Sequence, residues 1–473
     1  MRRIVQVAMF VSLLVGTTLQ GALAQQSDNI ERLAQVPIVI QADDPSTEED
    51  ESTFAKGSDL AFQGNTVVAG SWEGIGLFKL LPKDPYIQQQ SFALCPGAQG
   101  DVSVWGNLAF MSVDTPQVKS DGTQGDGGCD SIGASAAQVA EGLAWEGVRI
   151  FDISKPTRSP VLVGTVDADC GSHTHTLVPS GGKLYLYVLS YPLTGGLGPS
   201  CNYVVHRKAF IYEVDLKDPS KTGEEIVGTL DVSPAPGCHD VTVVPEKAIA
   251  IAACLVEGQI WDISDPTAPT ILSRIHNPFM IFHSSAMTWD GKIGVLGDEF
   301  AGAAAGAGCV SPDGRLGAMW FYDLTDPSNP QEVGHWGPPR TAFPSTAESA
   351  ARHACTTHNF NVLPMKDPNK YIAVSAYYAA GLSVVDFSDP ANPEEMAYYV
   401  PEYEGGQQGD MWAAYWYNGR IYTNDVNLPR ASASLPATDS AGVGVYEIKA
   451  LQKNAVRYFR TRLNPQVQVY DFR

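Results

Sequence analysis

After its N-terminus, the sequence lacks any long apolar segment. No stretch beyond residue 24 approaches the ~20 apolar residues that a membrane-spanning helix needs, so we expect no membrane span. Cationic residues are also scarce, with 31 lysines and arginines against 52 acidic residues. The formal net charge of −21 repels nucleic acid and anionic membrane surfaces, and we therefore expect neither as a partner.

Familiar catalytic motifs are absent as well. The chain contains no glycine-rich phosphate loop, no nucleophile elbow and no zinc-binding helix motif. Helical periodicity is scarce, whereas 45 glycines and 32 prolines separate many short strand-like runs. For a chain of this length, these features favour an all-β fold made of repeats over two or three unrelated domains.

The first 24 residues have the features of a secretory signal peptide. Arg2 and Arg3 precede an apolar run over residues 4–16, and a small-residue end follows at Ala22-Leu23-Ala24. We predict cleavage after this end, and hence a secreted, periplasmic or extracellular protein.

Two segments remain after the predicted cleavage. Residues 25–56 form an acidic leader, most acidic over residues 43–51, which is able to supply a closing strand. Residues 57–473 form the folded domain. Loss of the two arginines of the signal peptide moves the formal charge from −21 to −23.

A repeated signature runs through the folded domain. A strand ends in an acid flanked by aliphatic or aromatic residues, and a turn with proline follows. The clear copies have their acid at Asp152, Asp262, Asp323 and Asp386, each with a proline four residues later. Weaker copies lie at Glu213 and Glu447, and a degenerate copy has a lysine at Lys79. Seven units of four antiparallel strands, named A to D, predict a seven-bladed β-propeller.

We expect the repeated acids to be structural. A carboxylate at the end of a strand accepts hydrogen bonds from turn amides, and the proline that follows fixes the backbone of the turn.

The repeat resembles that of a known family, the LVIVD-repeat proteins, most clearly at Val384-Val385-Asp386-Phe387-Ser388-Asp389-Pro390. The resemblance covers about residues 57–448 and implies an exported or surface propeller. The sequence is also remotely similar to the selenium-binding protein family, which includes copper-dependent methanethiol oxidases with histidines near the propeller channel. No motif of that second family matches residue by residue, so no ligands are carried over from it.

Four histidines occupy the same place in consecutive units. His173, His239, His283 and His358 each stand six residues before the turn that ends strand A. They fall in blades three to six, so the propeller gathers them as an arc at the mouth of its channel. Imidazoles from separate strands suit a transition metal, with copper or iron favoured and zinc or manganese as alternatives.

Neighbouring residues extend this predicted metal site. His175 is a candidate fifth ligand or a proton-transferring catalytic base, because it lies on the same side of its strand as His173. Asp101 or Asp410, at the corresponding place in other blades, is able to add a carboxylate. The alternative is that histidine at this position only bonds neighbouring blades.

The long insertions all fall on the face where the histidines open their strands, which predicts a pocket for a small-molecule or glycan ligand. They cover residues 114–146, 191–207, 298–317, 338–357 and 424–441.

Eight cysteines in an exported chain predict four disulfides. Cys238 and Cys254 lie opposite one another in a predicted hairpin, and the same strand assignment pairs Cys95 with Cys129, Cys170 with Cys201 and Cys309 with Cys355. The alternative is that Cys170, Cys238 or Cys355 supplies a thiolate to the metal.

These observations lead to an exported metal-binding propeller, which is a metal-dependent oxidoreductase if the metal is catalytic. Two alternatives remain. One is a noncatalytic surface or adhesion propeller that binds protein or glycan through its insertions. The other is a lyase of acidic polysaccharides with His175 as base, which the scarcity of lysine and arginine disfavours.

Overall fold

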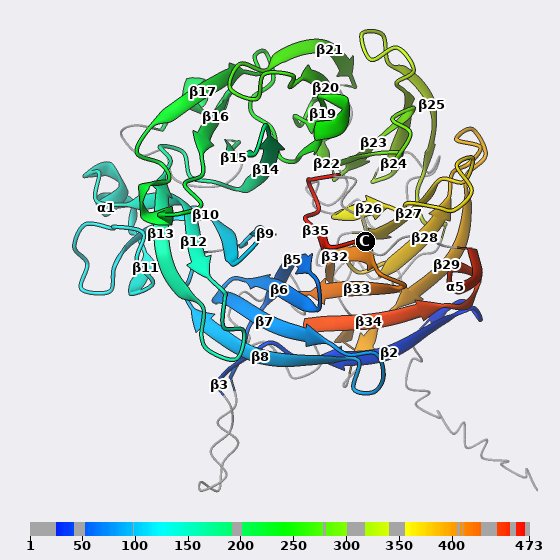
Figure 1. Cartoon of the computed structure of the whole chain (residues 1–473), viewed down its shortest axis with the longest axis horizontal. Coiled ribbons are helices and arrows are strands. Elements are labelled where there is room, and N and C mark those ends of the chain that lie inside the picture. The colour runs from blue at the N-terminus through cyan, green and yellow to red at the C-terminus, as the bar shows by residue number, and fades with distance from the viewer. Residues whose placement is uncertain are drawn as a thin grey trace, which may run out of the picture.

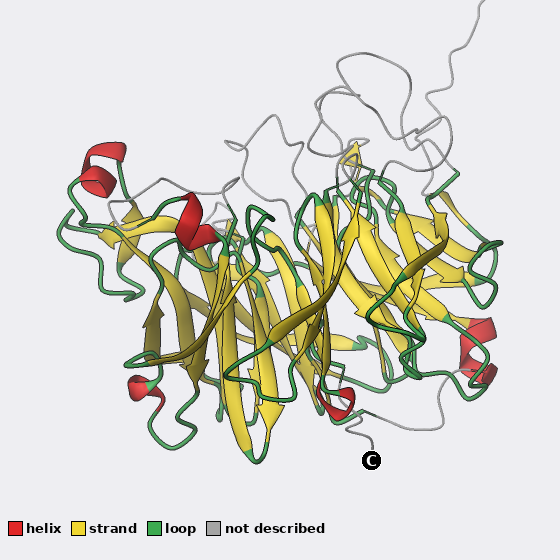
Figure 2. Ribbon diagram, turned by 90° about the horizontal axis from the view of Figure 1, so that it is seen from above, coloured by secondary structure: helices red, strands yellow, loops and turns green. Residues whose placement is uncertain are grey.

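The computed structural model describes residues 25–41, 53–97, 99–191, 201–277, 281–299, 317–339, 355–403, 407–408, 410–426, 442–454 and 460–468. Within them, seven sheets of antiparallel strands surround a central axis (Figure 1), and the strands run between two faces (Figure 2). The predicted seven-bladed β-propeller is therefore confirmed. The predicted signal peptide and the acidic run at residues 43–51 lie outside the described residues.

The first three blades follow one another along the chain. Blade 1 contains β5 (Gly57–Gln63), β6 (Thr66–Ser71), β7 (Gly74–Leu80) and β8 (Ile87–Leu94). Blade 2 contains β9 (Val102–Trp105), β10 (Leu108–Lys119), β12 (Trp145–Asp152) and β13 (Val161–Asp167), with β11 (Ser131–Gly133) paired to β10. Blade 3 contains β14 (Thr174–Ser180), β15 (Lys183–Leu189), β16 (Lys208–Glu213) and β17 (Ile226–Asp231).

The next three blades repeat this order. Blade 4 contains β18 (Val241–Val244), β19 (Ile249–Ala253), β20 (Glu257–Asp262) and β21 (Thr270–His276). Blade 5 contains β22 (Phe282–Met287), β23 (Ile293–Asp298), β24 (Met319–Asp323) and β25 (Gln331–Trp336). Blade 6 contains β26 (Phe360–Val362), β27 (Ile372–Ala376), β28 (Leu382–Asp386) and β29 (Glu394–Val400), with β1 (Gln25–Gln26) at its edge.

Blade 7 closes the ring with strands from both ends of the chain. It contains β32 (Met411–Tyr417), β33 (Arg420–Asp425), β34 (Gly442–Ile448) and the N-terminal β2 (Ile30–Val36). Strand β2 pairs antiparallel with β34, from Ile30 opposite Ile448 to Val36 opposite Val443. The outer strand of the last blade therefore comes from the segment that precedes blade 1.

Short elements decorate the blades. They are the strands β3 (Val39–Gln41), β4 (Thr53–Phe54), β30 (Glu402–Tyr403), β31 (Gln407–Gln408) and β35 (Arg462–Leu463). Among the described residues, the helices are α1 (Ala136–Ala140), α2 (Tyr203–His206), α5 (Lys449–Asn454) and the 3₁₀ turns η1 (Pro219–Lys221) and η2 (Pro245–Lys247). No helix among the described residues is long and apolar enough to cross a bilayer.

Aromatic side chains pack between neighbouring blades. Phe321 of blade 5 stacks on Phe387 of blade 6 with ring centroids 4.7 Å apart, and Phe62 of blade 1 stacks on Tyr417 of blade 7 at 4.8 Å. All four side chains are fully buried. The hydrophobic core is thus a series of contacts between blades, which the apolar, alternating strand sequences supply.

Glycines in outer strands make room for the turn of the next blade. A Cβ at Gly228 would lie 2.0 Å from the carbonyl oxygen of Thr267, and one at Gly334 would lie 1.7 Å from that of Pro390. Both glycines stand where the outer strand shifts register. Any larger residue there would push adjacent blades apart.

The repeated acids are structural, as predicted. Asp262 accepts the amide of Ser264 at 2.8 Å, and Asp323 accepts that of Thr325 at the same distance. Asp152 and Asp386 bond the amide two residues on in the same way. Each carboxylate therefore holds the turn between strands C and D.

Three predicted disulfides are confirmed. They join Cys95 to Cys129, Cys170 to Cys201 and Cys238 to Cys254. Cys355 is also disulfide-bonded, and Cys309, its predicted partner, lies outside the described residues. Because Cys170, Cys238 and Cys355 are all oxidised, the alternative that one of them supplies a thiolate to a metal is wrong.

Candidate metal centre

The four repeated histidines have equivalent backbone positions at the start of their innermost strands. The amides of His173, His239 and His358 donate to the carbonyls of Leu189, Ala253 and Ala376, each at the end of the neighbouring strand B. His283 is the second residue of β22. The common sequence register is therefore also a common structural register.

The side chains of these residues, which we call the histidine cluster, are brought together in the order of their blades. Nε2 of His173 lies 2.7 Å from Nε2 of His239. The rings of His239 and His283 have centroids 3.5 Å apart, and those of His283 and His358 are 4.2 Å apart. All four side chains are at most 4% exposed. Side chains from four blades thus form one contiguous, buried imidazole cluster.

Three of the rings are held from behind through Nδ1. His173 Nδ1 lies 2.5 Å from a carboxylate oxygen of Asp114, and His239 Nδ1 lies 3.0 Å from one of Asp240. His358 Nδ1 lies 2.5 Å from the carbonyl oxygen of Trp412. Oxygen acceptors of this kind place the ring proton on Nδ1 and leave Nε2 as a lone-pair donor.

This tautomer has a consequence for the His173–His239 contact. If both rings donate through Nδ1, two Nε2 lone pairs face each other across 2.7 Å. Such an arrangement is repulsive unless a proton or a metal cation lies between or beside the nitrogens. The hydroxyl of Tyr191, 3.2 Å from His173 Nε2, offers one neutral donor to this pair.

A carboxylate joins the other half of the cluster. Nε2 of His283 lies 3.8 Å from a carboxylate oxygen of Glu299, and donor atoms of His283, Glu299 and His358 all lie within 4.8 Å of one another. The second oxygen of Glu299 accepts the hydroxyl of Tyr378 at 2.7 Å. These three residues are close enough to share one ion after small adjustments.

Tyr378 reaches Glu299 from a strained backbone position. Its φ of +45° lies in the left-handed region, which is costly for a bulky residue. Reciprocal backbone bonds of 3.1 Å to Met411 of the next blade hold it there. The Tyr378 ring also lies 4.5 Å from that of His358, so the strained turn forms part of the wall around the cluster.

Three buried carboxylates, Asp59, Asp101 and Asp240, lie beside the cluster, and we call them the inner acids. They belong to the innermost strands of blades 1, 2 and 4 or directly precede them. Asp59 and Asp101 line a small cavity together with His173, His239 and His358. The cavity measures about 10 Å³, which is room for about one water-sized species.

Burial favours the neutral forms of His239 and of the inner acids. Burial, with the charges of the other three cluster histidines, lowers the pKa of His239 well below its usual value. Burial and the proximity of Asp59 raise the pKa of Asp101 and of Asp240. A divalent cation among the imidazoles would favour neutral histidine and ionised aspartate together.

The structure places His175 apart from the cluster. Its Nε2 lies 2.6 Å from the hydroxyl of Ser103 and its Nδ1 2.8 Å from that of Ser112, both in blade 2. The side chain is fully buried, and burial lowers its pKa to about 3. Its Nδ1 also lies 3.2 Å from a carboxylate oxygen of Asp101. With both nitrogens bonded, His175 joins blades 2 and 3, and its predicted role as a ligand or base stays a prediction.

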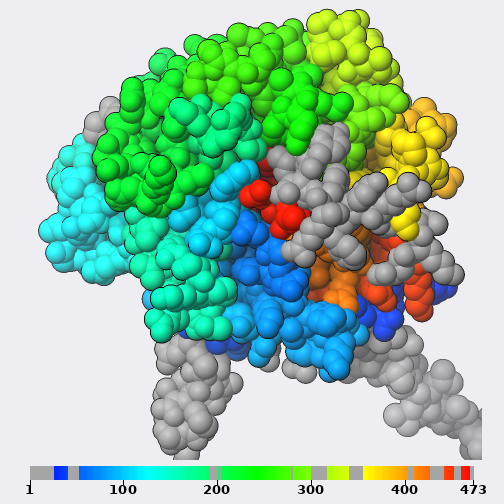
Figure 3. Space-filling view, in the orientation of Figure 1, coloured from blue at the N-terminus to red at the C-terminus, as the bar shows by residue number. Residues whose placement is uncertain are grey.

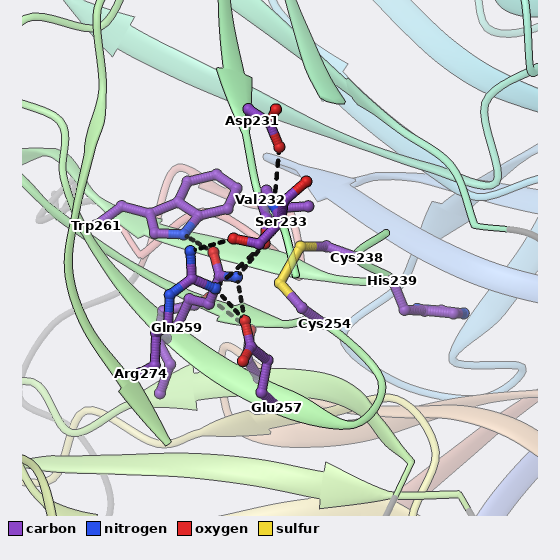
Figure 4. Close-up of a disulfide and its surroundings, with 12 residues drawn as sticks. Asp231, Val232, Ser233, Cys238, His239, Cys254, Glu257, Gln259, Trp261 and Arg274 are labelled. Carbon is purple, nitrogen blue, oxygen red and sulfur yellow. Dashed lines mark hydrogen bonds and ion pairs between the residues drawn. A yellow bond between two sulfur atoms is a disulfide. The ribbon is translucent and has the colours of Figure 1, made fainter. Parts of the chain in front are cut away.

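A disulfide fixes the backbone next to His239. Figure 4 shows the Cys238–Cys254 bond on one side of the strand and the imidazole directed away from it. Behind the disulfide, buried Glu257 pairs with Arg274 and accepts the Gln259 amide at 2.6 Å. Gln259 and Arg274 also bond the carbonyls of Val232 and Ser233, at the start of the segment that leads to His239.

Of the two carboxylates suggested from sequence, Asp101 lines the cavity, whereas Asp410 is buried and bonds Asp425 through its amide. Sequence reasoning missed the carboxylates that contact the histidines, Asp114, Asp240 and Glu299. Asp240 directly follows a cluster histidine, and Glu299 stands where a long insertion leaves its strand. These two positions in the sequence could have marked Asp240 and Glu299 as candidate site residues.

A second group of metal-type side chains, Cys170, Cys201 and His206, is not a thiolate site. The two sulfurs are bonded to each other at 2.08 Å, and His206 Nδ1 lies 3.0 Å from the hydroxyl of Ser190.

Comparisons with known proteins concern the fold. No curated protein matches the sequence. Among solved structures, the chain is similar to the periplasmic gluconolactonase PpgL of Pseudomonas aeruginosa, with 10% identity, a TM-score of 0.47, and coverage of 71% of this chain and 82% of that one. A likeness this distant carries no argument about activity.

The family model described as LVIVD repeat matches residues 370–400, which include strands β27, β28 and β29 of blade 6. The match contains the Asp386 motif, which is the clearest copy of the repeat in this sequence. This chain is a seven-bladed β-propeller that carries an LVIVD repeat.

Proposed function

We propose that this chain is an exported metal-binding propeller whose histidine cluster holds a transition metal, copper or iron, for redox chemistry. The observation that carries the proposal is the orientation of the imidazoles. Three Nδ1 atoms face oxygen acceptors, which directs Nε2 lone pairs toward the interior of the cluster. Histidines that only joined blades would have both nitrogens bonded locally, as His175 does.

The donor set favours copper or iron. Neutral imidazoles suit copper, iron and zinc, and no described thiolate is present to favour a softer site. The chain's own residues have separable tasks in this proposal. The imidazoles bind the metal, Asp114 and Asp240 fix two rings, and the Tyr191 hydroxyl lies where it is able to donate to a group beside His173.

The experiment is elemental analysis of the natively exported protein beside two double variants. The wild type should contain about one copper or iron per chain, and His239→Ala with His283→Ala should contain none. The matched control is His276→Ala with His335→Ala, which removes two histidines from outer strands and should leave the metal content unchanged. A wild type without transition metal would overturn the proposal.

A redox role needs a second measurement. Ascorbate should reduce and air reoxidise the bound metal, as followed by electron paramagnetic resonance. A metal that binds stoichiometrically but does not cycle would instead favour a noncatalytic propeller with a structural ion.

A further inference from the structure

The C-terminal segment Arg460–Gln468, which we call the C-terminal plug, lies at the centre of the propeller and contacts the inner acid Asp101. Its strand β35 pairs with the end of β5, where Leu463 lies opposite Phe62, and Val467 bridges Val243 of β18. The plug thus connects blade 1 to blade 4. Figure 1 places β35 beside the axis, and Figure 3 shows atoms of this C-terminal region at the centre of the same face.

Amide side chains stand at alternate positions of the plug. Asn464 bonds the backbone amide and carbonyl of Val104 at 2.7 and 2.9 Å. Gln468 bonds the amide and carbonyl of Met287 at 2.6 Å each. Both residues therefore act as anchors, because each replaces the two backbone bonds that a neighbouring strand would make.

Gln466 lies between these anchors and has different partners. Its amide nitrogen lies 3.1 Å from a carboxylate oxygen of Asp101, and Asp240 is a second acidic neighbour of the side chain. The side chain is 2% exposed. Asp240 in turn lies 3.0 Å from Nδ1 of His239. Polar side chains that neighbour one another, Gln466, Asp240 and His239, therefore link the plug to the histidine cluster.

We propose that Gln466 is a positioning residue for the histidine cluster, acting through Asp240 on His239. This inference rests on the proposed function. Its physical basis is that partners behind a ligand fix its tautomer and ring orientation, and their loss costs roughly 10- to 100-fold in metal affinity. Because Gln466 acts on the ligand only through Asp240, we expect its loss to reduce metal affinity by an amount at the lower end of that range.

The test compares Gln466→Met with Gln468→Met, a matched control in the same plug that loses two amide hydrogen bonds to backbone instead. The probe is Cu²⁺ alone, added to the full chain after chelator treatment, with affinity measured by competition and geometry by electron paramagnetic resonance. Gln466→Met should weaken Cu²⁺ binding by about tenfold and alter the copper hyperfine splitting. Gln468→Met should change neither.

A double-mutant cycle gives a second measurement. In an Asp240→Asn background, Gln466→Met should weaken binding much less than tenfold, because the carboxylate through which it acts is gone. Gln466→Asn, whose shorter side chain draws the amide away from Asp240, replaces the methionine variant if the latter fails to fold.

The outcomes separate the two proposals. Wild-type protein that takes up no Cu²⁺ refutes the proposed function. Wild-type binding with equal affinity and spectrum in both plug variants refutes the positioning role alone, and so does equal weakening in both, since that would make the plug a general brace.

Discussion

The centre of the propeller and its outer turns use aspartate in opposite ways. In the turns between strands C and D, Asp262 and Asp323 accept hydrogen bonds from residues two positions on, and these bonds lower the pKa of each carboxyl. At the centre, burial raises the pKa of Asp59, Asp101 and Asp240. The turn acids are satisfied by their own local sequence, whereas the inner acids depend on partners from other blades.

This difference separates structural from functional acids. A turn acid repeats with its motif and needs only the next two residues and a proline. An inner acid has a costly buried charge, which persists only if other blades or a cation offset it. Acids in the second group are therefore the ones that we connect with the histidine cluster.

The largest expected effect is that of removing the charge of Asp240. Asp240→Asn keeps an oxygen near His239 but loses the carboxylate, and we expect Cu²⁺ affinity to fall roughly 10- to 100-fold, which is about 1.4–2.7 kcal/mol. Competition titration measures the change. Asp262→Asn, in the outer turn of the same blade, is the control and should bind Cu²⁺ like the wild type. Equal affinities in all three proteins would remove the functional distinction between the two groups of acids.

A second prediction concerns Glu146, another acid whose pKa is raised. Burial and the charges of Asp114 and Asp167 raise it from 4.5 to about 8. The native state therefore keeps a proton that the unfolded chain releases between these pH values, so the free energy of unfolding falls as pH rises through that window.

Glu146→Gln should abolish this fall. Relative to the wild type, the free energy of unfolding of the variant should rise by about 2 kcal/mol between pH 4.5 and 8. This value is smaller than the full pKa shift would give, because the side chain is partly exposed to solvent. Urea unfolding across this pH range measures the difference. Parallel profiles for the two proteins would show that Glu146 titrates normally.

The smallest effect is expected in an outer turn. Asp262→Ala loses the bond to the Ser264 amide, and at pH 7 we expect a cost of about 0.5 kcal/mol because the turn is well solvated. The pKa of Asp262 is lowered in the folded state, so this contribution is present above the unfolded pKa of about 4 and disappears as pH falls through the folded value. Urea unfolding at pH 7 and pH 2 tests both points. A difference that persists undiminished at pH 2 would contradict this account.

Much of the fold was predictable because it depends on local, repeated patterns. The acid-turn motifs at Asp152, Asp262, Asp323 and Asp386 marked the blades, and the hairpin around Glu246 placed Cys238 opposite Cys254. Periodicity along a strand and turn chemistry are properties of neighbouring residues. They can therefore be recognised without knowing where any blade lies.

The site was predictable only in part. Four histidines in one register indicated a cluster, because equivalent positions of a propeller converge on its axis. The partners behind them were not visible: Asp114 approaches His173 from blade 2, and Trp412 approaches His358 from blade 7. Neither contact follows a sequence period, since each joins residues 54 or more positions apart.

By itself, then, the sequence determined the number of blades, their turns and the register of the cluster histidines, because these follow from side-chain alternation and short-range hydrogen bonding. Only the tertiary structure decided which ring nitrogens face inward, that His175 bonds two serines instead, and that Gln466 near the C-terminus lies against Asp101 and Asp240. Those outcomes depend on how seven blades and a terminal segment meet at one axis. Polar groups buried there are costly unless they are hydrogen-bonded, so the available partners fix the orientation of each side chain.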